Sequence, residues 1–182
     1  HRSHSLTIDL KTGTTTTHDQ EGDDWVVHLL DTGYDTQTGG RVRQVAEFIG
    51  EETFMLTYGD GVSNVDIDQL LQFHHSKGKL ATMTAVRPPA RFGQMQFNGE
   101  RVSHFEEKPQ LGEGWINGGF FVLEPGIKNY IDSDLLPWER DPMERLAKEG
   151  ELMAYRHEDF WQCMDTLRDV QHLEKTWQEG MA

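Results

Sequence analysis

The sequence predicts an α/β protein with a mixed, mostly parallel sheet. Apolar, β-favouring runs at 54–58 and 81–86 flank a segment that opens as a helix at 65–68 and stops at Gly78. This order of strand, helix and strand is a βαβ unit. Further strand patterns follow at 115–123 and 152–155. We expect a single domain over residues 1–182, in which residues 1–24 are polar and alternate in the manner of a β-hairpin.

Composition narrows the function classes. The 182 residues carry 31 acidic and 17 basic side chains, so the net charge is −14, which disfavours nucleic acid and anionic membranes as partners. No apolar run is long enough to cross a membrane, and residues 1–5 lack the apolar core of a signal peptide, so we expect a cytoplasmic protein. The single cysteine, Cys163, excludes an internal disulfide. An anionic substrate would need local cations or a metal ion in this acidic chain.

One aspartate follows the first apolar run at once. Asp60 stands between Gly59 and Gly61, directly after the strand pattern at 54–58. In open α/β sheets the ligand crevice lies outside the carboxyl ends of the strands, and flanking glycines let a ligand or metal approach the backbone. Asp60 is therefore a candidate catalytic or metal-binding residue at the end of a central strand. The alternative is a plain turn, which the same three residues also favour.

A pair of glycines opens a predicted helix. Gly39 and Gly40 precede Arg41, after which apolar residues recur with helical spacing up to position 49. A helix N-terminus presents free backbone N–H groups to an anion or another polar ligand. The alternative is a loop that simply starts a surface helix. Just upstream, residues 25–30 form an apolar run that predicts another strand.

A lysine follows a predicted hairpin at 92–105. Glu107 and Lys108 stand directly before Pro109. Because proline fixes the chain after it, Lys108 is held more firmly than a surface lysine and suits a phosphate contact as a point charge. The alternative is a charged surface loop that binds no ligand, because charged residues before a proline usually lie in such loops.

Two glycines, Gly118 and Gly119, lie inside the strand predicted at 115–123. Glycine weakens a strand interior, so the pair predicts a bulge or the close approach of another group to the backbone. The alternative is room for a bulky neighbour such as Trp115. Farther along, Asp165 follows the aromatic segment 160–164 and precedes a closing helix.

These motifs resemble the sugar-phosphate nucleotidyltransferases, and within that family most closely the cytidylyltransferase branch. Each motif is modest by itself, whereas the ordered set is specific and runs from about residue 25 to the C-terminus. The matching segments are 32–33, 38–41, 58–62, 91–93, 107–109, 116–122, 160–161 and 164–169.

The resemblance implies a Rossmann-like α/β/α sandwich. It also implies an enzyme that transfers a cytidylyl group from CTP to glucose 1-phosphate, with Mg²⁺ as cofactor, in a homo-oligomer that makes CDP-glucose for cell-surface polysaccharide. On this basis the catalytic residues are Asp60, Lys108 and Asp165, of which the two aspartates hold the metal and the lysine meets the sugar phosphate. The implied substrate-binding residues are Gly39, Gly40, Arg41, Gly59, Glu107, Asn117 and Gly118, among which Glu107 and Asn117 contact sugar hydroxyls.

One family feature is missing from this sequence. Family members begin with a strand and a glycine-rich Gly-Gly-x-Gly-Thr-Arg loop that cradles the nucleotide phosphates, and neither occurs here. We therefore expect an N-terminally incomplete, partial nucleotidyltransferase domain. A second hypothesis is a truncated, non-catalytic relative that acts as a sugar-phosphate-binding or protein-association module. A third, a sugar transferase or phosphatase that uses Asp60, leaves the downstream motifs unexplained. The choice of nucleotide base stays open, because other branches share several of these motifs.

Overall fold

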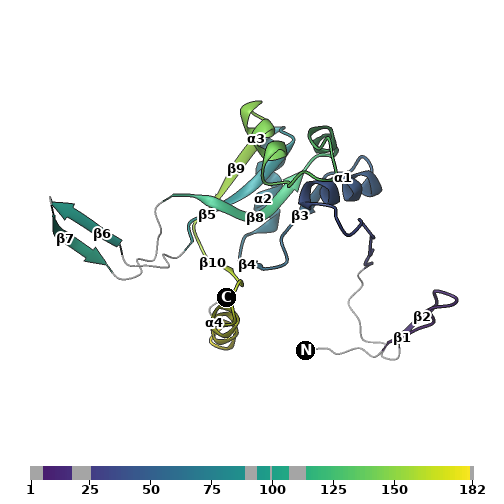
Figure 1. The fold of residues 1–182 in the computed structure, drawn as a ribbon, viewed down its shortest axis with the longest axis horizontal. Coiled ribbons are helices and arrows are strands. Elements are labelled where there is room, and N and C mark those ends of the chain that lie inside the picture. Colours follow the sequence, from purple (N-terminus) through teal and green to yellow (C-terminus); the bar gives the residue numbers. More distant parts are fainter. Residues whose placement is uncertain (1–5, 18–25, 89–93, 99, 107–113, 181–182) are drawn as a thin grey trace. The chain divides into compact units, whose positions relative to one another are not determined.

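The computed structural model describes residues 6–17, 26–88, 94–98, 100–106 and 114–180 (Figure 1). The chain divides into two compact units, His1–Asp31 and Thr32–Ala182, whereas the sequence predicted a single partial domain over 1–182. The reason lies in the first unit, where the described apolar side chains stay exposed: Leu10 is 92% and Leu29 is 93% accessible. Side chains that stay this exposed do not form an apolar core within this unit.

The first unit is a small hairpin followed by an extended segment. Strands β1 (Leu6–Ile8) and β2 (Thr15–Thr17) pair antiparallel, with Ile8 opposite Thr15. Within the turn, the Asp9 carboxylate accepts hydrogen bonds from the backbone N–H groups of Lys11 and Thr12, and these bonds lower the pKa of Asp9. The strand predicted at 25–30 is not formed over residues 26–30. A strand needs a neighbour for its backbone groups, and none of the described strands pairs with this segment.

The second unit alternates helices and strands. In chain order its described elements are α1 (Thr38–Ile49), β3 (Phe54–Leu56), β4 (Gly61–Ser63), α2 (Ile67–Lys77), β5 (Ala81–Val86), β6 (Gln94–Asn98), β7 (Arg101–Glu106), β8 (Ile116–Leu123), the 3₁₀ helix η1 (Pro125–Tyr130), α3 (Asp141–Lys148), β9 (Leu152–His157), β10 (Trp161–Cys163) and α4 (Leu167–Gln178). The hairpin predicted at 92–105 is confirmed as the antiparallel pair β6 and β7.

Four strands form the main sheet in the order β3-β8-β5-β9. Strand β8 runs antiparallel to both β3 and β5, while β5 and β9 run parallel. The α/β class and the mixed sheet are confirmed, but parallel pairing is less extensive than the sequence predicted. Strands β3 and β5 do share one direction, as expected for a βαβ unit, with β8 inserted between them. Strand β3 is consequently an edge strand among the described residues, where the sequence predicted a central one.

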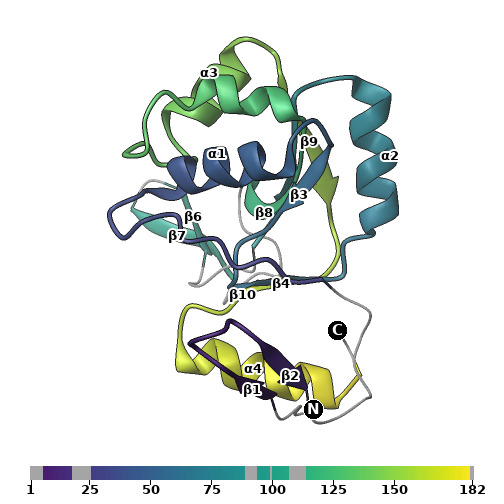
Figure 2. The ribbon, with the colours of Figure 1, turned by 90° about the vertical axis from the view of Figure 1, so that its right-hand side faces the viewer.

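Helices cover both faces of the main sheet. Ala81, Phe121 and Leu123 belong to a core that also contains Val42 of α1 and Leu146 of α3. Side chains alternate between the faces of a sheet, so the intervening residues of β5 and β8 point toward α2. Figure 2 shows α1 and α3 on one side of the sheet and α2 on the other. The expected α/β/α sandwich is thus present in the second unit.

The helix boundaries follow the signals in the sequence. Asp66 caps α2 by accepting a hydrogen bond from the N–H of Gln69 at 2.9 Å, and Gly78 ends this helix with a positive φ of 58°. Helix α4 begins with a capping box between Thr166 and Asp169. None of the helices in the described part of the chain is long and apolar enough to cross a membrane.

Candidate active site

Asp60 lies in the turn that connects β3 to β4. Strand β4 leaves the main sheet and pairs antiparallel with β10, so that Gly61 stands opposite Cys163. The ladder continues one step farther, because the N–H of Met164 donates to the carbonyl of Asp60 at 2.8 Å. This hydrogen bond joins the Asp60 turn to the residue directly before Asp165.

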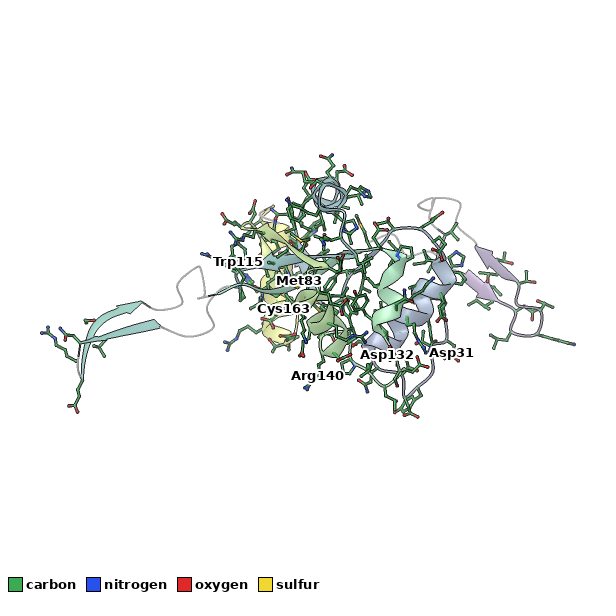
Figure 3. The ribbon with its side chains drawn as sticks, turned by 90° about the horizontal axis from the view of Figure 1, so that it is seen from above. Asp31, Met83, Trp115, Asp132, Arg140 and Cys163 are labelled. Carbon is green, nitrogen blue, oxygen red and sulfur yellow. The ribbon has the colours of Figure 1, made fainter. Side chains whose placement is uncertain are left out.

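Asp165 lies in the short connection between β10 and α4. The Sγ of Cys163 donates to Asp165 Oδ2 at 3.4 Å, and Thr166, the next residue, is the N-cap of α4. Figure 3 labels Cys163, together with Asp31, Met83, Trp115, Asp132 and Arg140. Both carboxylates, Asp60 and Asp165, are exposed to solvent. The two aspartates singled out in the sequence are therefore brought to neighbouring backbone positions and are accessible to a ligand.

Gly118 and Asn117, at the start of β8, lie at the same end of the sheet. The indole Nε1 of Trp161 in β10 donates to the carbonyl of Gly118 at 2.8 Å, which ties β10 to β8. A Cβ on Gly118 would lie 2.7 Å from Val86 Cγ1, and one on Gly119, whose φ is +83°, would lie 2.5 Å from the ring of Tyr58. The predicted close approach to the backbone is present, and Tyr58, not Trp115, is the large neighbour.

Tyr58 connects Asn117 to a loop carboxylate. Asn117 Nδ2 donates to the Tyr58 hydroxyl at 3.2 Å, and that hydroxyl donates to Glu139 Oε1 at 2.8 Å. Burial, followed by the hydrogen bond to Glu139 and the negative charges of Glu139 and Asp60, raises the pKa of Tyr58 well above its ordinary value of 10.0. Tyr58 is therefore a neutral hydroxyl at physiological pH.

Gly39 and Gly40 form the first turn of α1 and pack tightly on the loop 134–138. The N–H of Gly39 donates to the carbonyl of Leu136 at 3.0 Å. A Cβ on Gly39 would lie 2.4 Å from that oxygen, and one on Gly40 would lie 2.6 Å from Asp134 Cα. This packing favours the structural alternative for both glycines. Their contact with a nucleotide stays a prediction.

Arg41 is exposed and points its guanidinium to the Thr32 hydroxyl. It also lines a cavity of about 200 Å³ beside β3. The lining of this cavity is almost entirely apolar, and the residues around it are Thr38, Arg41, Val42, Val45, Phe54, Met55, Leu56, Tyr58, Trp138 and Glu139. The start of α1 and the hydrogen-bonded pair Tyr58 and Glu139 therefore line one surface hollow.

Two of the predicted site residues, Glu107 and Lys108, lie outside the described residues. The structure gathers the others into two neighbouring groups: Gly59, Asp60, Asn117, Gly118 and Asp165 at the end of the sheet, and Gly39, Gly40 and Arg41 at the start of α1. Tyr58 and Glu139 link these groups, but neither was predicted as a site residue. Tyr58 stands inside a matched motif, whereas no local pattern distinguishes Glu139 from other loop carboxylates.

Asp60 and Asp165 are carboxylates of the kind that can bind a magnesium ion together with a substrate. Mg²⁺ keeps several waters and is usually bound by one or two carboxylates together with substrate phosphates. Among the described residues, no cluster of three or more His, Cys, Asp or Glu side chains could hold a metal by protein ligands alone. Two hard carboxylates, each in a loop next to one of the paired strands β4 and β10, are the kind of donors that the joint arrangement requires.

Comparison with known proteins places the chain in a family. The model of the nucleotidyl transferase family matches residues 11–174. Because this match covers most of the chain, it shows that the chain belongs to the nucleotidyl transferase family.

Two curated relatives are similar over most of the chain. Glucose-1-phosphate cytidylyltransferase of Salmonella typhimurium is 48% identical over 166 residues, which cover 91% of this chain and 65% of that protein. The probable glucose-1-phosphate cytidylyltransferase of Bacillus subtilis is 39% identical over 180 residues, covering 98% of this chain and 70% of the relative. The chain thus spans about two thirds of the length of these relatives.

A solved structure supports the fold. The putative glucose-1-phosphate thymidylyltransferase from Bacillus anthracis superposes with a TM-score of 0.56 over 79% of this chain and 62% of its own, at 18% sequence identity. At this identity the likeness bears on the fold alone.

Proposed function

We propose that this chain transfers a cytidylyl group from CTP to glucose 1-phosphate, which forms CDP-glucose and releases pyrophosphate, with Mg²⁺ as cofactor. The observation that carries the proposal is the 2.8 Å hydrogen bond from Met164 N–H to the Asp60 carbonyl, which joins the Asp60 turn to the residue directly before Asp165. The relatives from Salmonella and Bacillus, both described as glucose-1-phosphate cytidylyltransferases, support the choice of base and sugar.

The proposed reaction needs positioning and charge neutralisation. A phosphate oxygen of glucose 1-phosphate attacks the α-phosphorus of CTP, the new P–O bond forms, and pyrophosphate leaves with the electrons of the broken bond. The attacking oxygen is already anionic, so the site need not contain a general base. When bound, Mg²⁺ would neutralise charge on the reacting phosphates.

Each proposed role belongs to a residue of this chain. Asp60 and Asp165 provide the metal-binding carboxylates, and Asn117 orients a sugar hydroxyl with its side-chain amide. Lys108 meets the sugar phosphate and Arg41 the nucleotide. A homo-oligomeric state, a cytoplasmic location and a part in polysaccharide synthesis stay predictions of the sequence and of the family resemblance.

A second candidate function is a non-catalytic module that binds a sugar phosphate or another protein. One observation favours it: the outer side of β3 pairs with no strand in the described part of the sheet, and open strand edges can pair with another chain. The paired aspartates favour the enzyme over this candidate, because solvent-exposed carboxylates on adjoining turns add nothing to the core.

Pyrophosphate release by the 182-residue chain separates the two candidates. We expect release with CTP, glucose 1-phosphate and Mg²⁺, and a loss of about a hundredfold or more in Asp60→Asn. Asp68→Asn, an exposed aspartate in the first turn of α2, is the matched control and should keep the full rate. Glucose 1-phosphate binding by a folded chain that releases no pyrophosphate, both alone and after the family's N-terminal strand and glycine-rich loop are joined to it, would contradict the enzyme and support the module.

A further inference from the structure

Both ends of the Asn117 side chain are fixed by hydrogen bonds within the protein. Its Oδ1 accepts from the N–H of Gly119 at 2.9 Å, and its Nδ2 donates to the Tyr58 hydroxyl at 3.2 Å. An amide retains a second proton on nitrogen and a second lone pair on oxygen, so Asn117 can still bind a ligand hydroxyl. The direction in which it does so depends on whether Tyr58 is itself fixed.

Tyr58 has one hydroxyl proton, and Glu139 determines where it points. The hydroxyl donates to Glu139 Oε1 at 2.8 Å, which leaves its lone pairs to accept from Asn117. The ring is held edge-on against Phe121, with centroids 6.0 Å apart. Without the carboxylate the hydroxyl could turn its proton toward Asn117 or toward water, and the acceptor that Nδ2 needs would be lost part of the time.

Glu139 is fixed in turn by the start of α1. The Thr38 hydroxyl donates to Glu139 Oε2 at 2.8 Å, and it accepts from the N–H of Trp138 at 2.8 Å. Thr38 is the first residue of the helix that carries Arg41. A continuous path of hydrogen bonds therefore runs from the start of α1 through Glu139 and Tyr58 to Asn117.

We propose that Glu139 is a positioning residue of the site, which acts through Tyr58 to orient Asn117 for a sugar hydroxyl. This inference rests on the proposed function, since the sugar contact of Asn117 belongs to it. The competing interpretation is that Glu139 merely anchors the loop 131–140 to α1. The two interpretations can be told apart, because the positioning role requires the Tyr58 hydroxyl, which lies between Glu139 and Asn117, whereas anchoring of the loop does not.

The chain contains a matched control for this pair. Tyr130 donates its hydroxyl to Glu149 Oε2 at 2.6 Å, and that bond raises the pKa of Tyr130 as Glu139 raises that of Tyr58. The described contacts of Tyr130 and Glu149 do not include Asn117. Glu149→Gln therefore removes a tyrosine–glutamate pair of the same kind outside the site.

The experiment measures two quantities on the 182-residue chain: the Kd for glucose 1-phosphate by calorimetry, and tyrosine ionisation from ¹³C signals of the tyrosine Cζ atoms. In Glu139→Ala we expect the Kd for glucose 1-phosphate to rise about fivefold to tenfold, which is equivalent to the loss of one hydrogen bond. We expect Tyr58→Phe to raise the Kd by the same factor. Glu139→Gln keeps an acceptor for Tyr58 and should restore Kd to within about twofold of wild type. Because the negative charge is gone, the pKa of Tyr58 should fall in Glu139→Gln but stay unchanged in Glu149→Gln.

The outcomes separate the inference from the function on which it rests. A Kd that is unchanged in folded Glu139→Ala and in Tyr58→Phe, but weakened in Asn117→Ala, would overturn the positioning role and keep the sugar contact. A Kd unchanged in Asn117→Ala would overturn the sugar contact itself. If Glu139→Ala does not fold, Tyr58→Phe and Glu139→Gln still decide, because both preserve the bulk of the side chain.

Discussion

Gly39 and Gly40 illustrate how single residues are placed in this chain. Neither position has room for a side chain, because a Cβ on Gly39 would lie less than 3 Å from Leu136 O and one on Gly40 less than 3 Å from Asp134 Cα. The sequence predicted a turn at these glycines and a helix after them; the helix is present but begins earlier, at Thr38, so that both glycines belong to its first turn. Their partners could not be predicted, since the loop 134–138 lies far away in the chain and leaves no local pattern at residue 39. Glu139 escaped prediction for the same reason.

Substitution of Gly40 tests this tight packing. Gly40→Ala should lower the free energy of unfolding by about 1–3 kcal/mol, because the new methyl group would push against backbone that cannot turn away. Gly59→Ala is the control, since a Cβ there would meet nothing within 4 Å and φ is not positive. Urea unfolding measures both variants. Equal stability of the two variants would contradict the packing described here.

Among the secondary-structure elements, helix α2 is attached to the sheet by a buried network of hydrogen bonds. His74, which is 1% exposed, bonds Thr82 Oγ1 of β5 at 2.8 Å through Nδ1 and Glu124 Oε1 at 3.0 Å through Nε2. The Thr53 hydroxyl also donates to Glu124. Helical periodicity and the Gly78 stop predicted α2 correctly. They could not show that one of two adjacent histidines is buried, because that depends on which face meets the sheet.

The adjacent histidines provide a direct comparison. His74→Ala should cost about 2–4 kcal/mol of unfolding free energy, because it creates a cavity and leaves Thr82 and Glu124 without a partner. His75→Ala, on the exposed side of the same turn, should change stability by less than about 0.5 kcal/mol. Chemical denaturation, followed by circular dichroism, measures the free energy of unfolding of both variants. A similar loss in both variants would show that the network does not attach α2.

At the scale of the whole molecule, the sequence predicted the α/β class, the mixed sheet and the family correctly. It did not predict that β8 runs between β3 and β5, because antiparallel pairing between distant segments leaves no periodic signal in either strand. The proximity of Asp60 and Asp165 likewise followed only from the family resemblance, since it depends on the pairing of β4 with β10. The separation of His1–Asp31 from the rest was also unexpected.

Divalent metal binding shows whether Asp60 and Asp165 form one site. Mn²⁺ can replace Mg²⁺ as a paramagnetic probe, and its binding to the chain in the presence of CDP-glucose can be followed by electron paramagnetic resonance. We expect Asp60→Asn and Asp165→Asn each to weaken Mn²⁺ binding about tenfold or more, and the double variant to be little weaker than either single one, because the carboxylates share one ion. Asp68→Asn should bind Mn²⁺ as the wild type does. Unchanged binding in either single variant, or losses that add in the double variant, would contradict a shared site.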